Sequence, residues 1–97
     1  MSTAREKLFR QLYGYLAVNG IIRFSPPHYI WRNKDQTREI TLAFGEMERI
    51  TGAIIALWYK ELKIRDISEV PDNYKDNIRL FVDQRILDYY GEEIVGE

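Results

Sequence analysis

The sequence predicts a mainly α-helical domain, and three observations support this fold class. Apolar residues recur at helical spacing in three long stretches of the chain. Residues that start or stop helices bound these stretches. The 97 residues are 45% hydrophobic and 30% charged, which is typical of a globular chain. We therefore expect one domain over residues 1–97, with main helices at about 3–18, 36–62 and 71–90 and a short helix near 26–32.

The first helix has the clearest boundaries. Thr3 and Glu6 have the spacing of a capping box. Asn19 and Gly20 form a good stop, because both tolerate the left-handed backbone that often follows a helix. Between them, the apolar stripe consists of Leu8, Leu12, Tyr15 and Leu16.

The segment 25–32 has two interpretations. Ser25 is able to cap a short helix that has Pro26 at its first position and runs to about Arg32. Alternatively, Pro26 and Pro27 form a rigid turn into an extended segment, 28–32. We favour the short helix.

The segment 36–62 decides the fold class. We favour a single long helix, because apolar residues keep helical spacing for more than twenty residues. The alternative is an α+β fold with a β-hairpin at about 28–44, since residues 39–44 also alternate as a strand does. The pattern leaves open whether 39–44 is helix or strand. The expected stripe is Ile40, Phe44, Met47, Ile50, Ile54, Leu57, Trp58 and Leu62.

The last helix begins at a proline and ends at a glycine. Pro71 suits a first helical turn, and Gly91 suits a stop. Residues 92–97 are then a frayed acidic tail. The expected buried stripe is Tyr74, Ile78, Phe81, Val82 and Tyr89.

Charge is distributed unevenly along the chain. Residues 1–38 carry seven basic and two acidic residues, a net of +5, whereas residues 39–97 carry seven basic and thirteen acidic residues, a net of −6. Such a basic region attracts polyanions or acidic proteins. Its cations alternate with aromatic residues, a combination that neutralises phosphates and stacks on unpaired bases but also occurs at protein interfaces. The candidate nucleic-acid or partner-binding residues are Lys7, Arg10, Arg23, His28, Tyr29, Trp31, Arg32, Lys34 and Arg38.

The expected long helix has small residues on the side opposite its apolar stripe. Glycine inside a helix costs about 1 kcal/mol relative to alanine, so glycines repeated on one side indicate a close approach by another element. We predict a helix-packing or dimer face there, formed by Gly45, Arg49, Gly52, Ala56 and Tyr59. Two charges, Glu61 and Arg85, fall within apolar stripes. Because buried charges are expensive unless paired, we predict a structural ion pair between them.

The residue inventory argues against catalysis. The chain has no cysteine, and His28 is its only histidine, so thiol and disulfide chemistry are excluded. Motifs of hydrolases, nucleotide-binding proteins and zinc proteases are absent. We expect no enzyme activity, no catalytic residue, no metal and no cofactor. The longest apolar run, 53–59, falls far short of the roughly 20 residues of a membrane span. No signal peptide is evident, so a cytoplasmic protein without membrane contact is expected.

We therefore expect a non-enzymatic module for protein interaction or assembly that self-associates, as a dimer by preference. The alternative is a nucleic-acid-binding protein that uses the basic, aromatic N-terminal half. The general composition (small, without cysteine, rich in Tyr, Ile and Arg) resembles that of accessory proteins of phages and archaeal viruses. That likeness implies the host cytoplasm as location; it is carried by no motif and assigns no residue.

Overall fold

A computed structural model describes the backbone of residues 3–95 and the side chains of residues 3–91. Helix α1, Ala4–Val18, begins with the predicted capping box, in which the Glu6 backbone N–H donates to the Thr3 hydroxyl at 3.1 Å. Gly20 follows the helix with a φ of 72°, in the left-handed region. The first helix and its stop signal are confirmed. Its fully buried residues are Leu8, Leu12 and Leu16.

Within the described residues, the segment after α1 forms a three-stranded antiparallel sheet in the order β1-β2-β3. The strands are β1 (Ile22–Ser25), β2 (His28–Arg32) and β3 (Glu39–Ala43). The expected short helix near 26–32 is therefore wrong, and the two prolines form the turn between β1 and β2. The expected long helix is wrong over residues 36–43, where the alternative hairpin is present instead.

Pairing between the strands explains this correction. Ile40 lies opposite Trp31, and Leu42 lies opposite Tyr29. Trp31 and Leu42 are fully buried on the face of the sheet that packs on the core. The spacing of Ile40 and Phe44 fits a helix turn as well, but only the strand brings the apolar side chains of β3 beside those of β2.

Helix α2, Phe44–Ile55, continues into a π-helical turn, η1, Ala56–Glu61. The Leu62 N–H donates to the Leu57 carbonyl at 2.9 Å, the wider spacing of a π-turn. The predicted central helix is thus confirmed only from residue 44 onward. A 3₁₀ turn, η2 (Ile67–Glu69), then leads toward the last helical region.

The last helical region contains a short helix α3, Asp72–Asp76, and a longer helix α4, Ile78–Val95. The backbone of α4 kinks at Tyr90, directly before the predicted stop at Gly91, and then continues. Residues 92–95 are therefore helical, and the remainder of the expected frayed tail, 96–97, lies outside the described residues.

The buried stripe of α4 also differs from the expected one. Tyr74, Phe81 and Tyr89 are each more than a third exposed. Ile78 and Val82 are buried as expected, and the helix also buries Ile86, so the buried residues are spaced four apart on one side.

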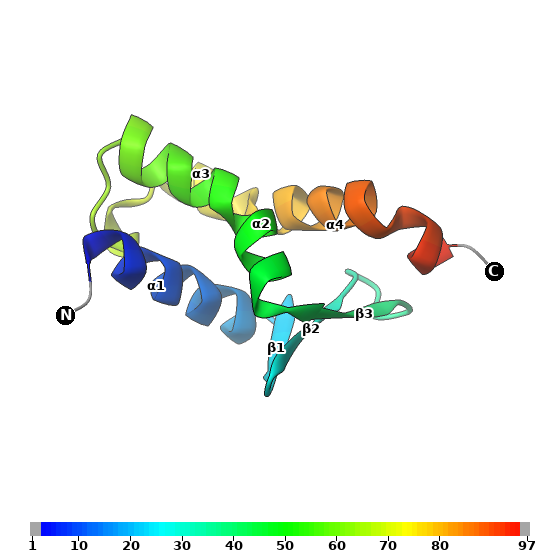
Figure 1. The fold of residues 1–97 in the computed structure, drawn as a ribbon. Coiled ribbons are helices and arrows are strands. Elements are labelled where there is room, and N and C mark those ends of the chain that lie inside the picture. Colours follow the sequence, from blue (N-terminus) through cyan, green and yellow to red (C-terminus); the bar gives the residue numbers. More distant parts are fainter. Residues whose placement is uncertain (1–2, 96–97) are drawn as a thin grey trace.

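The core lies between the sheet and the helices (Figure 1). In that view α1 lies beside the sheet, α2 rises from the end of β3, and α4 runs above the hairpin of β2 and β3. Trp31 and Trp58 are the largest fully buried side chains among the described residues. This arrangement leaves two aromatic surfaces exposed, one between α2 and α4 and one between α1 and the sheet.

Candidate interaction surfaces

The first exposed surface lies where η1, α3 and α4 meet. Four large apolar or aromatic side chains on it are between 38% and 43% exposed. They are Leu57, Tyr74, Phe81 and Tyr89. Leu57, Tyr74 and Phe81 line an apolar cleft of about 120 Å³. The buried Ile54, Trp58 and Ile78 form its floor. Together with Arg49 and Arg85, the four side chains define what we call the α2–α4 face.

Two arginines cover aromatic rings of the α2–α4 face. The Arg49 guanidinium lies 5.7 Å from the centre of the Tyr89 ring. The Arg85 guanidinium lies 5.3 Å from the centre of the Phe81 ring. Exposed aromatic rings with arginines beside them are the composition of binding hot spots.

The predicted Glu61–Arg85 ion pair does not form. Ion pairs among the described residues include Lys7–Asp66, Arg32–Glu39 and Arg79–Asp83, and none of these involves Glu61 or Arg85. Glu61 is exposed at the end of the π-helical turn, which rotates it away from the position that regular helical spacing predicts. Arg85 remains half-buried against Phe81, and its Nε atom is buried without a hydrogen-bond partner among the described residues.

The residues of the predicted dimer face have separate environments. Gly45 is the second residue of α2, where glycine costs little, and Arg49 belongs to the α2–α4 face. A Cβ built on Gly52 meets no atom within 4 Å, so this side of α2 is open. Ala56 is exposed, whereas Tyr59 is half-buried with the Arg65 guanidinium 4.0 Å from its ring centre.

The second exposed surface is a cluster of five rings, which we call the aromatic cluster. Its members come from α1, the β1–β2 hairpin and the start of α2: Phe9, Tyr13, Phe24, Tyr29 and Phe44. Neighbouring ring centres are between 5.2 and 6.0 Å apart. Sequence reasoning included Tyr29 but missed the other four, because they come together only when the hairpin packs on α1.

Four members of the aromatic cluster, all except Phe24, line a pocket of about 290 Å³ that also has charged walls. Arg5, Arg10, Glu6 and Glu48 line it, and the Arg5 guanidinium lies 4.8 Å from the centre of the Phe9 ring. The Tyr13 hydroxyl is hydrogen-bonded to the Thr51 hydroxyl at 3.3 Å. Burial raises the pKa of Tyr13 above its ordinary value, so this ring stays neutral.

The structure distributes the predicted basic and aromatic site residues over several places. Lys7 and Arg10 lie on α1, where Lys7 pairs with Asp66 at 3.0 Å. Arg23, His28 and Arg32 are on the sheet face opposite Tyr29 and Trp31, because side chains alternate along a strand. Lys34 and Arg38 belong to the turn between β2 and β3. The nine residues therefore do not form one continuous face.

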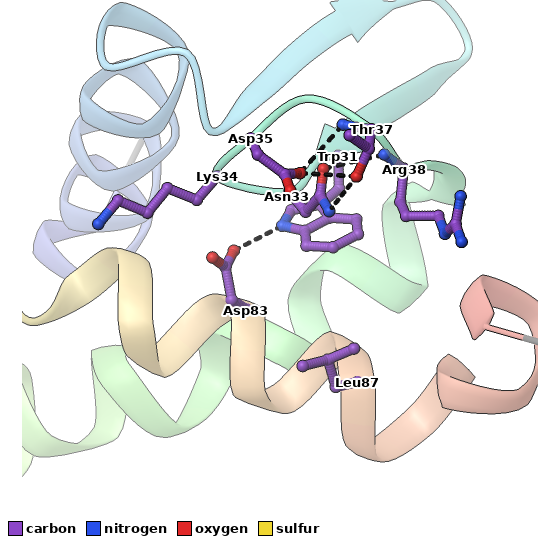
Figure 2. A pocket seen from close by; sticks show the side chains of 8 residues that line it. All are labelled: Trp31, Asn33, Lys34, Asp35, Thr37, Arg38, Asp83 and Leu87. Atoms are coloured by element: carbon purple, nitrogen blue, oxygen red, sulfur yellow. Dashed lines mark hydrogen bonds between the residues drawn. The ribbon is translucent and has the colours of Figure 1, made fainter.

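Lys34 and Arg38 border a cleft between that turn and α4 (Figure 2). The cleft holds about 930 Å³, and in Figure 2 the two cations extend from opposite sides of the turn. Trp31 closes its inner end, with the indole N–H donating to Asp83 at 2.8 Å. Burial raises the pKa of Asp83, while the Trp31 hydrogen bond and Arg79 act in the opposite direction. Trp31 is thus a core residue here and not an exposed stacking platform.

No helix within residues 3–95 combines the length and apolar character that crossing a membrane requires. Among the side chains that the structure describes, no three acidic or histidine residues gather as a metal site. Comparisons with family models, with curated proteins and with solved structures find no match to this chain.

Proposed function

We propose that the protein is an interaction module that self-associates through the α2–α4 face. The carrying observation is that Leu57, Tyr74 and Phe81, each about 40% exposed, line one apolar cleft, while the exposed Tyr89 lies against Arg49 of α2. Contiguous apolar surface rimmed by polar groups is characteristic of protein–protein contacts. Two arginines stack on its rings, and the open Gly52 lies at its border on α2.

A second copy of the chain is the occupant that this face fits. In a two-fold dimer the same face supplies both halves, so it needs an apolar centre and charges of both signs at its rim. Arg49 and Arg85 supply the positive charges, and the exposed Asp88, one residue before Tyr89 on α4, supplies a negative one. The partially buried guanidinium of Arg85 would gain carboxylate or carbonyl acceptors from the second copy.

Sedimentation measurements on Phe81→Gln, with Leu80→Gln as matched control, test this proposal. The unaltered protein is expected to have about twice the 11.6 kDa of the chain, with little change at high salt, because apolar contacts are not screened. Phe81→Gln should shift the mass toward one chain. Leu80 is 68% exposed on another side of α4, so Leu80→Gln should leave the mass unchanged.

Leu57→Gln is a second variant on the same face, in case Phe81→Gln unfolds. A single-chain mass for the unaltered protein at every concentration would reject self-association. An equal response to the substitutions at Leu80 and Phe81 would show that the association is nonspecific.

A further inference from the structure

The aromatic cluster is a second surface, separate from the α2–α4 face. Phe24 is 53% exposed and Phe44 is 47% exposed, with their ring centres 5.9 Å apart. Both rings contact Tyr29, which is half-buried beneath them. Phe24 and Phe44 therefore present their ring faces in fixed positions, as a platform, because Phe24 and Tyr29 belong to paired strands and Phe44 begins helix α2.

Positive charge surrounds this platform on two sides. Arg5 and Arg10 line the pocket from α1. Arg23 directly adjoins Phe24 in β1 and projects from the opposite sheet face. β1 is an edge strand, so a flexible chain is able to pass around it from the rings to Arg23.

Two acidic residues, Glu6 and Glu48, line the pocket beside the platform, and their carboxylates have different roles. Glu6 uses its carboxylate to cap α1, accepting from the Thr3 hydroxyl at 3.2 Å. Glu48 also lines the pocket and is exposed, but it takes no part in capping α1. Glu48 is therefore the charge that most opposes an anionic ligand at this surface.

We propose that the aromatic cluster binds single-stranded nucleic acid, with bases stacked on Phe24 and Phe44 and phosphates near Arg5, Arg10 and Arg23. Unpaired bases offer the flat faces that exposed rings accept, and the backbone supplies the negative charge that arginines neutralise. A duplex fits less well, since its bases are stacked on one another and hide their faces. An apolar peptide would offer no complementary charge to Arg5 and Arg23.

Fluorescence anisotropy of labelled oligothymidylate and oligouridylate tests this binding on the intact protein. Phe24→Ala and Phe44→Ala are each expected to weaken binding about tenfold through lost stacking. Arg5→Ala and Arg23→Ala should make the salt dependence shallower by about 0.7 for each lost phosphate contact. The controls are Leu80→Ala for an exposed apolar residue and Lys60→Ala for an exposed cation, and both should bind normally.

Glu48→Gln gives a test with the opposite sign. Removing this negative charge should strengthen the binding of an anionic strand, most clearly at low salt, whereas a cationic ligand would bind less well. The proposal is overturned if neither oligonucleotide binds at low salt. Unchanged binding by both phenylalanine variants, or tighter binding of a duplex, would also overturn it, because phosphate contacts alone would then explain the affinity.

Discussion

At the scale of single residues, Asp83 holds the indole of Trp31 at the contact between the hairpin and α4. The Trp31 N–H donates to its carboxylate at 2.8 Å, and Arg79 Nε lies 3.5 Å from the other oxygen. Arg79 also donates to the Arg32 carbonyl at 2.9 Å, so one arginine connects α4 with both the carboxylate and β2. The joint between these elements thus depends on three side chains.

Asp83 also gives this joint a pH dependence. Because burial raises its pKa in the folded protein, its contribution to stability is complete below the unfolded-state pKa and is lost as pH rises through the folded-state value. Asp83→Asn keeps an acceptor for Trp31 and does not ionise. As pH rises from acid to neutral, the unaltered protein should lose stability at this site and the variant should not. The free energy of unfolding of Asp83→Asn should therefore increase relative to that of the unaltered protein.

Urea unfolding at several pH values measures this difference. A difference that stays constant with pH would contradict the shifted pKa of Asp83. Asp83→Leu is the matched comparison, because it leaves the indole N–H of Trp31 without an acceptor and should cost about 1–3 kcal/mol.

Gly52 permits a second prediction at this scale. No atom lies within 4 Å of a Cβ added there, so Gly52→Ala should raise the free energy of unfolding by about 1 kcal/mol through helix propensity. Gly52→Leu places a larger side chain beside the α2–α4 face and should weaken self-association by overpacking the contact. Chemical unfolding and sedimentation measure the two effects. If Gly52→Leu leaves the mass unchanged, Gly52 lies outside the contact between copies.

At the scale of elements, Asp66 ties the segment after η1 to α1. Gln11 donates from Nε2 to Asp66 at 2.8 Å and accepts from the Ile67 backbone N–H at 2.9 Å. Lys7 pairs with the same carboxylate, and the Ser68 hydroxyl and N–H donate to its other oxygen. The Ser68 bonds are local, but the contacts of Gln11 and Lys7 with this segment cross 55 residues of sequence or more, and no local pattern predicts them.

The contacts of Asp66 predict a loss of stability in acid. The hydrogen bond from the Ser68 side chain, followed by that from Gln11, lowers the pKa of Asp66 well below its ordinary range. Its contribution to stability is therefore present above the unfolded-state pKa and is lost as pH falls toward the folded-state value. Asp66→Asn should flatten the acid side of the curve of unfolding free energy against pH. Equally steep curves for both proteins would show that other carboxylates cause the acid sensitivity.

At the scale of the whole molecule, the charge asymmetry is only partly neutralised within the chain. Two of the ion pairs among the described residues, Lys7–Asp66 and Arg32–Glu39, join a base of the first 38 residues to an acid of the remainder. Both pairs are exposed, so each contributes little to stability. The remaining cations lie near the aromatic cluster, on the outer sheet face and in the turn after β2. The molecule thus separates an apolar face between α2 and α4 from a more basic side.

The sequence alone determined the elements whose signals are local. The capping box at Thr3 and the stop at Gly20 lie at the ends of a stripe with period 3.6, and helix α1 follows them closely. The periodic segment from Met47 to Trp58 is likewise helical, although a π-turn ends it. It buries Met47, Ile50, Ile54 and Trp58 as expected, but leaves Leu57 exposed. Such signals succeed because helix hydrogen bonds join residues four positions apart.

Only the tertiary structure decided the sheet and both candidate surfaces. Residues 39–43 carry a pattern that suits a helix or a strand, and the choice depends on their pairing with β2. That pairing buries Trp31, which removes it from the expected binding residues, and brings Phe24 and Phe44 together beside Tyr29. The exposed side of α4 was also decided by its neighbours, because apolar residues occur around most of that helix. Contacts between residues distant in sequence set these outcomes, and periodicity within one segment carries no information about them.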